Sequence, residues 1–139
     1  MFHEGIVKIL DFGLSKIMHG EDTRMDLTSQ GVGTYWYLPP ETFEDFDPKI
    51  SAKVDVWSLG VIFFEMLYGR KPFGHGVPQS EIYNKGIILS AHKVVFPNET
   101  PRKHRVSDNA KKFIQACLCH EQDERLSPSE AYAHPYLSK

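Results

Sequence analysis

The chain has 139 residues, a length that suits one domain or one lobe of a larger domain, and 41% of its residues are hydrophobic. Its 16 basic and 18 acidic side chains leave a formal net charge of −2, so no overall field favours nucleic acid or a membrane surface as a partner. The longest apolar stretch, residues 54–67, is too short to span a bilayer, and residues 1–4 lack the start of a secretory signal, so we expect a protein that is not secreted.

The first predicted element is a short strand. Residues 5–10 are mostly β-branched or aliphatic, and the tripeptide Asp11-Phe12-Gly13 follows them directly. We expect this strand to be buried, with Phe12 packed beneath Asp11 and Gly13 allowing the backbone to turn. Residues 14–38 show no sustained hydrophobic period and contain three glycines, which predicts a long loop.

After residue 50 the predicted elements are almost all helical. A helix over 52–68, with Ser51 as its cap and Gly69 at its end, is apolar nearly all round and is therefore expected to be central and buried. A weaker helix is predicted over 80–89, interrupted by Gly86. A third begins after Ser107 with one apolar stripe, and a fourth begins with a capping box at residues 127–130.

Five motifs occur along the chain in a fixed order. They are Asp11-Phe12-Gly13, Gly33-Thr34, Pro39-Pro40-Glu41, Asp55-Val56-Trp57-Ser58-Leu59-Gly60 and Asp123-Glu124-Arg125-Leu126. Together they resemble the C-terminal lobe of a eukaryotic Ser/Thr protein kinase. The stretches 27–41 and 67–75 further resemble Tousled-like kinases. The resemblance covers residues 1–139 and implies a mainly α helical lobe, α+β when complete, that starts at the strand before Asp11, with an activation segment at 11–41 and the helical lobe at 42–139.

The resemblance assigns the nucleotide and metal chemistry to the first motif. Asp11 would bind the Mg²⁺ ion that bridges the ATP phosphates, because a hard cation prefers carboxylate oxygen. Phe12 and Gly13 would complete the cofactor-binding segment. Thr34 resembles the threonine of the substrate-binding loop in Ser/Thr kinases.

Three further residues are implied to hold the frame. Glu41 and Arg125 would form a buried ion pair that ties the end of the activation segment to the helical lobe, and Pro39 stands where the family has alanine. Asp55 would hold the backbone of the catalytic loop. Because these 139 residues contain no such loop, we expect Asp55 to be a buried carboxylate without a partner.

The loop hydroxyls and the metal-binding residue types are less specific. Thr23, Thr28 and Ser29 are candidate phosphorylation sites, with ordinary loop hydroxyls as an equal alternative. The seven histidines and two cysteines show no spacing typical of a zinc site.

We therefore predict part of a Ser/Thr kinase that uses ATP and Mg²⁺ and acts on protein substrates. By resemblance the substrates are histone chaperones and the location is nuclear, or otherwise cytoplasmic, with no direct nucleic-acid or membrane partner. Only ten residues precede Asp11, so the glycine-rich loop, the ATP-anchoring lysine and the catalytic base are absent, and we expect the chain alone to be inactive. A truncated gene model explains this best. The alternative is a non-catalytic kinase-like binding or competitor module. The sequence does not determine the oligomeric state.

Overall fold

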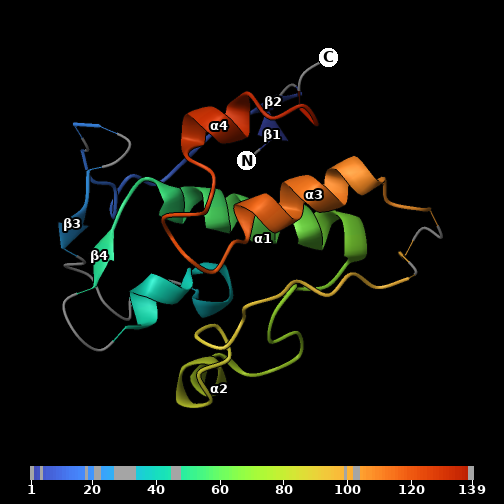
Figure 1. The fold of residues 1–139 in the computed structure, drawn as a ribbon, viewed down its shortest axis with the longest axis horizontal. Helices are drawn as coiled ribbons and strands as arrows, with labels where there is room; N and C mark the ends of the chain where they lie inside the picture. Colours follow the sequence, from blue (N-terminus) through green and yellow to red (C-terminus); the bar gives the residue numbers. More distant parts are fainter. Residues whose placement is uncertain are drawn as a thin grey trace.

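The computed structural model describes residues 2–3, 5–17, 19–20, 23–26, 34–44, 48–98, 100–101 and 104–137. In these ranges the fold is mainly helical, with four α-helices, two short 3₁₀ helices and two small antiparallel ribbons. None of the helices described there is long and apolar enough to cross a membrane. Figure 1 shows the helices grouped around one central helix, with one ribbon at the edge of the molecule.

The central helix is α1, Lys53–Tyr68. The Ser51 hydroxyl accepts a hydrogen bond from the Lys53 amide at 3.3 Å, and the helix ends at Gly69, whose φ of 66° suits a residue without a side chain. One face is buried, as expected. The expectation of burial all round is wrong, because three apolar side chains on another face are exposed in the structure: Leu59, Ile62 and Met66.

Two helices pack against α1, α3 (Asp108–Cys117) and α4 (Pro128–Tyr132). The Ser107 hydroxyl caps α3 by accepting from the Ala110 amide at 3.2 Å. The predicted capping box of α4 is confirmed, since Ser127 Oγ accepts from the Glu130 amide and a Glu130 carboxylate oxygen accepts from the Ser127 amide. Local sequence signals thus determine where both helices begin.

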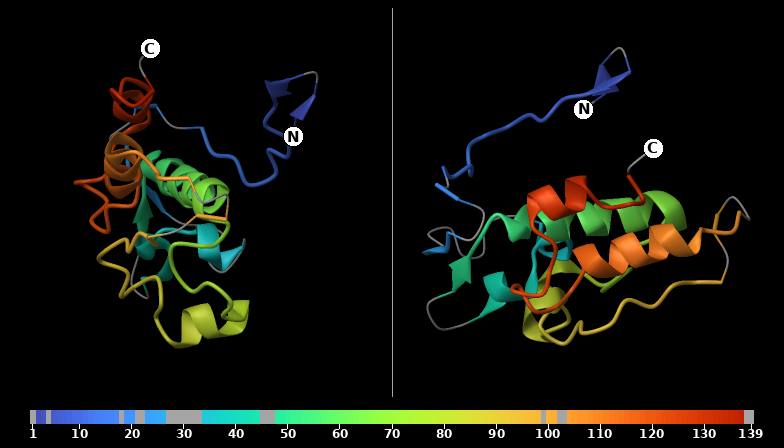
Figure 2. Two further views of the ribbon diagram at one scale, coloured as in Figure 1. Left: turned by 90° about the vertical axis from the view of Figure 1, so that its right-hand side faces the viewer. Right: turned by 45° about the horizontal axis from the view of Figure 1, so that its top comes forward.

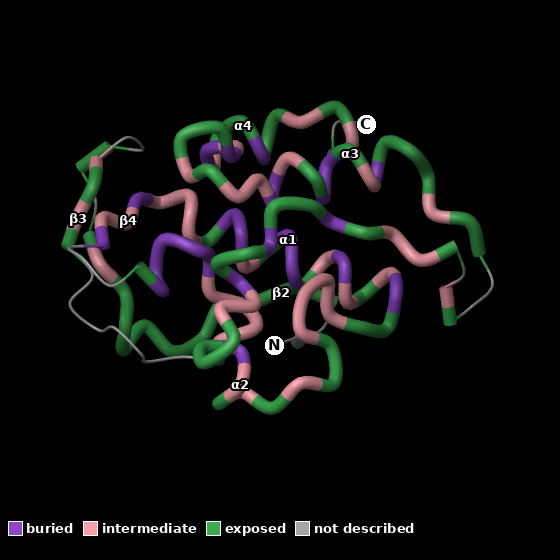
Figure 3. The backbone as a smooth tube through the Cα atoms, turned by 60° about the horizontal axis from the view of Figure 1, so that its bottom comes forward, coloured by how far each residue is buried: buried purple, intermediate pink, exposed green. Residues whose placement is uncertain are grey.

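On the other side of α1 lies α2, Gln79–Asn84, which is shorter than predicted because Gly86 adopts a φ of 57° that ends the helix early. The 3₁₀ helix η1 (Tyr35–Tyr37) contacts both α1 and α2, and the second 3₁₀ helix, η2 (Pro40–Phe43), packs against residues 49–50. Figure 3 shows the buried stretches gathered around α1 and these neighbouring segments. The core is therefore organised around the buried face of α1.

The strands are all two residues long. The predicted strand over 5–10 is reduced to β2, Ile6–Val7, which pairs with β1, Phe2–His3, and its side chains are exposed instead of buried. Figure 2 shows this hairpin standing apart from the helices in both views. The second ribbon joins β3, Met25–Asp26, to β4, Lys49–Ile50, with an ion pair between Asp26 and Lys49 across the strands.

Candidate functional site: a tethered segment and an acidic cleft

The most deeply buried charges of the described residues belong to Arg125 and Glu41, which lie 84 positions apart in the sequence. Arg125 Nη1 donates to Glu41 Oε1 at 2.7 Å, and Nη2 donates to Oε2 at 3.0 Å. The Arg125 side chain is 0% exposed and the Glu41 side chain 5%. The two residues thus make the bidentate buried pair that the resemblance implies.

Arg125 also organises the backbone around it. Its Nε donates to the Cys119 carbonyl at 3.0 Å, and its two Nη atoms donate to the carbonyls of His120 and Lys53 at 3.1 and 3.3 Å. Its guanidinium lies 4.9 Å from the ring centre of Trp57, a cation–π contact. One side chain therefore connects η2, the first turn of α1 and the loop that follows α3.

The segment before Glu41 is attached to α1 by a second set of contacts. Ser58 Oγ donates to the Tyr37 carbonyl at 2.8 Å, and Tyr37 Oη donates to Glu65 Oε2 at 2.7 Å. Trp36 Nε1 donates to the Gly74 carbonyl at 3.0 Å, beyond the end of α1. Residues 36–41 are consequently held along the length of the central helix.

Charge reinforces this attachment. Lys71 Nζ lies 3.1 Å from Glu65 Oε1 and 5.3–5.4 Å from the ring centres of Trp36 and Tyr37. The hydrogen bond from Tyr37, together with Lys71, holds the pKa of Glu65 below its ordinary value, and the bond to Glu65 raises the pKa of Tyr37. Glu65 therefore supplies the negative charge that holds Tyr37 and Lys71 against α1.

Asp11 has an unusual backbone. Its φ of 67° lies in the left-handed region, and its Oδ1 accepts a hydrogen bond from the Gly13 amide at 3.1 Å. The expected packing of Phe12 beneath it is wrong, because Phe12 is 68% exposed. The expected turn at Gly13 is confirmed, since the Ser15 amide donates to the Phe12 carbonyl at 3.0 Å across it.

A cleft of about 880 Å³ has both Asp11 and Asp55 in its lining. The side chain of Asp55 makes no hydrogen bond among the described residues, and partial loss of solvent around its carboxyl group raises its pKa. The expectation that Asp55 is buried is wrong, because the residue is exposed in the structure. Its place in the first turn of α1 directs an acidic group to the same cleft as the first motif.

The threonine predicted to bind substrate and the predicted phosphorylation sites do not form one cluster among the described residues. Thr34 is exposed at the start of η1, where its carbonyl accepts from the Tyr37 amide at 2.9 Å. Thr23 is partly exposed, and its amide donates to the Gly20 carbonyl at 3.2 Å. Thr28 and Ser29 lie outside the described residues. Sequence reasoning missed the roles of Ser58, Glu65 and Lys71, because their contacts with Trp36 and Tyr37 join residues that are more than 20 positions apart.

The family of the chain follows from comparison with known proteins. The sequence model described as "Protein kinase domain" matches residues 1–137. The chain therefore belongs to the protein kinase domain family.

Within that family it is similar to Tousled-like Ser/Thr kinases. It is 54% identical over 139 residues to "Serine/threonine-protein kinase tousled-like 1" of Homo sapiens, with 96% of this chain and 18% of the relative covered. It is 47% identical over 137 residues to "Serine/threonine-protein kinase TOUSLED" of Arabidopsis thaliana, with 96% of this chain and 20% of the relative covered. The chain thus spans about a fifth of the length of these curated relatives.

Proposed function

We propose that the protein containing this segment transfers the γ-phosphoryl group of ATP to Ser or Thr hydroxyls of protein substrates. In this proposal residues 11–41 form the activation segment and residues 42–139 belong to the helical lobe. The observation that carries the proposal is the double attachment of residues 36–41 to α1, through the Arg125–Glu41 pair and through Glu65. Phosphoryl transfer depends mainly on positioning, so a rigid seat for the substrate is a chemical requirement.

The residues of the first motif fit a magnesium ion. Asp11 and Asp55 both line the cleft. Among the described residues the Asp11 carboxylate forms no ion pair, and its one hydrogen bond is with the Gly13 amide. Mg²⁺ typically takes one or two carboxylates with substrate phosphates and water. Asp11 would hold the ion, which when bound neutralises phosphate charge. The peptide NH of Gly13 fixes the orientation of that carboxylate.

The attached segment would seat the protein substrate. Thr34 stands at its exposed end, next to aromatic side chains that are themselves held against α1 and the loop that follows it. By likeness to the Tousled-like relatives, we propose histone chaperones as substrates and the nucleus as location. Phosphates on Thr23, Thr28 or Ser29 would act on the same segment by adding charge.

The test uses the complete protein expressed from its own gene, with radiolabelled ATP and either casein or a histone chaperone. Asp11→Ala is expected to abolish transfer, and Glu65→Gln to lower kcat/KM for protein substrate while leaving ATP binding intact. The exposed Glu81→Gln is the matched control and should be unaffected. Equal transfer by wild type and Asp11→Ala would contradict the proposal and favour a non-catalytic binding module.

A further inference from the structure

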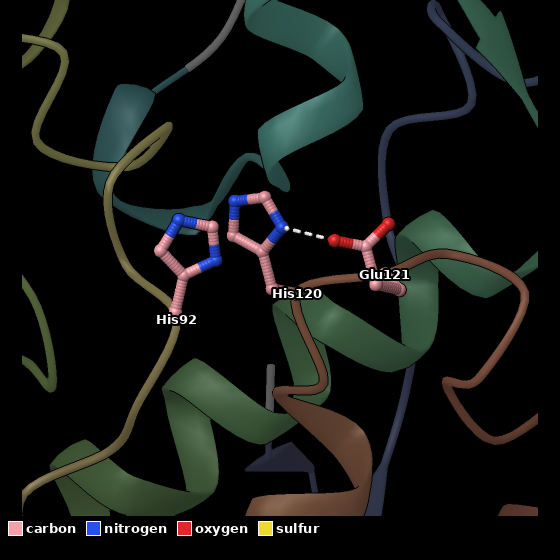
Figure 4. A group of neighbouring side chains, drawn as sticks. All are labelled: His92, His120 and Glu121. Carbon is pink, nitrogen blue, oxygen red and sulfur yellow. Dashed lines mark hydrogen bonds and ion pairs between the residues drawn. The ribbon is translucent and has the colours of Figure 1, made fainter.

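A group of side chains outside the proposed kinase site meets where two loops approach each other. His92 follows the turns after α2, and His120 and Glu121 lie in the loop after α3. One ligand atom from each of the three lies within 4.8 Å of the others, and the two imidazole rings are 4.0 Å apart between centroids. Figure 4 shows the rings side by side and the Glu121 carboxylate turned toward His120.

The hydrogen bonds of His120 determine where its ring proton lies. Nε2 is 2.8 Å from the Leu89 carbonyl, and a carbonyl oxygen can only accept, so Nε2 carries the hydrogen. In the neutral ring Nδ1 then presents a lone pair toward Glu121 Oε1, 3.2 Å away. Two acceptors at this distance repel unless a cation lies between them. The cluster therefore has a place for a positive charge, either a proton or a metal ion.

The arrangement around His120 is typical of a metal-binding histidine. Such a residue usually donates its second ring N–H to a backbone carbonyl or carboxylate, which fixes the ring and makes the other nitrogen more basic. Here the Leu89 carbonyl has that role, from 31 positions earlier in the sequence. The free nitrogen of His120 is thereby directed at Glu121.

The distances suit a small tetrahedral ion. Zinc bonds of about 2.0–2.2 Å place neighbouring ligand atoms roughly 3.3–3.5 Å apart. The Nδ1–Oε1 distance of 3.2 Å is already close to such an edge. His92 is exposed, and one of its ring nitrogens lies within 4.8 Å of a ligand atom of each of the other two residues. Two imidazoles with one carboxylate select zinc-like ions over Mg²⁺ or Ca²⁺, which prefer oxygen alone.

The backbone of the site is held in place without the ion. Arg125 donates to the carbonyls of Cys119 and His120, and the His92 amide donates to the Ser90 carbonyl at 3.0 Å. Because the loops are already ordered, little conformational entropy is lost when the ion binds. A cleft of about 240 Å³ is lined in part by His120 and Glu121 and has room for water next to these two side chains.

We propose that His92, His120 and Glu121 bind a divalent transition-metal ion, Zn²⁺ being the best match. The ion joins the loop after α2 to the loop after α3, next to the backbone that Arg125 organises. Its role is structural, since it adds a link between two loops that the hydrogen bond from His120 Nε2 to the Leu89 carbonyl already joins. The proposal stands independently of the kinase activity.

The test is a Zn²⁺ titration of the 139-residue chain against a chromophoric chelator, with His92→Ala, His120→Ala and the control His104→Ala. His104 is exposed, and its backbone amide and carbonyl both form hydrogen bonds with the Thr100 hydroxyl, which the alanine variant would keep. We expect one Zn²⁺ per wild-type chain, at least a tenfold weaker affinity in the two cluster variants, and no change in the control. Wild-type affinity in both cluster variants, or no binding to the wild type, would overturn the proposal.

A second measurement removes the dependence on folding of the variants. His92→Ala leaves the bond between His120 and Leu89 intact, so this variant should keep its far-ultraviolet circular dichroism. Saturating Zn²⁺ should raise the melting temperature of the wild type and of His104→Ala but not of His92→Ala. An equal rise in all three would show that the ion binds elsewhere, and no rise in any would show that it does not stabilise the fold; either result overturns the structural role.

Discussion

Removing either partner of the Arg125–Glu41 pair should destabilise the protein strongly. Breaking a buried ion pair by deleting one side chain costs about 3–5 kcal/mol, because the remaining charge is left without compensation. Arg125→Ala should lie at the upper end of this range or above it. This substitution leaves the Glu41 carboxylate and three backbone carbonyl groups without their hydrogen-bond donor, and it removes the cation–π contact with Trp57. Glu41→Ala leaves Arg125 with those carbonyl partners and should cost less.

A double-mutant cycle measured by urea unfolding checks this reasoning. The double variant should cost less than the sum of the single variants, with a coupling of about 0.5–3 kcal/mol. Glu41→Gln is a milder variant that keeps an acceptor for Arg125, in case the alanine variants do not fold. The exposed pair Glu81–Lys85 is the matched control, for which a coupling of about 0.3–0.5 kcal/mol is expected. Single effects within about 0.5 kcal/mol of wild type, adding without coupling, would refute the buried pair.

Three further changes test other parts of the fold. The pKa of Glu65 is held below 4.5, chiefly by Tyr37, so its stabilisation is present above that pH and is lost as pH falls through the lower folded-state pKa. Glu65→Gln should thus lower the free energy of unfolding by about 1 kcal/mol or less at pH 7, because the carboxylate is partly exposed. In urea unfolding at the acid end of a pH series, the same substitution should have no effect. Burial raises the pKa of Cys117 to about 12 and also raises the pKa of the partly exposed Cys119, so a disulfide reagent should modify Cys119 before Cys117, and Cys117 only on unfolding. Gly60→Ala should lower the free energy of unfolding by about 1–3 kcal/mol, because the added Cβ would lie 2.8 Å from Cys117 Cβ.

Each of these expectations has a control. If Glu65→Gln lowers the free energy of unfolding by the same amount at every pH, the charge of Glu65 is not the cause. In Cys119→Ser the faster of the two modification reactions should disappear. If it persists, Cys117 is accessible to the reagent in the folded protein. Gly20→Ala, where the nearest atom is 3.4 Å away, should be tolerated, and an equal loss there would exclude close helix packing as the cause.

Signals that act within a few residues were sufficient to predict one end of each of three helices. The capping box at Ser127, the cap at Ser107 and the positive φ at Gly69 each depend on neighbours along the chain, so the sequence alone placed these helix ends. The order of motifs along the chain likewise indicated the kinase family. Even the Arg125–Glu41 pair, however, came from family resemblance, since nothing local in the sequence joins residues 84 positions apart.

Tertiary structure decided which side chains meet and which stay exposed. Hydrophobic pattern predicted burial for Phe12 and for every face of α1, but burial needs a second surface, and the described residues supply none for Phe12 or Met66. Spacing rules for zinc ligands consider residues close in sequence, so they missed His92 and His120, which the packing of two loops brings together. Long-range contacts depend on how whole elements dock, and that information is spread over the entire chain.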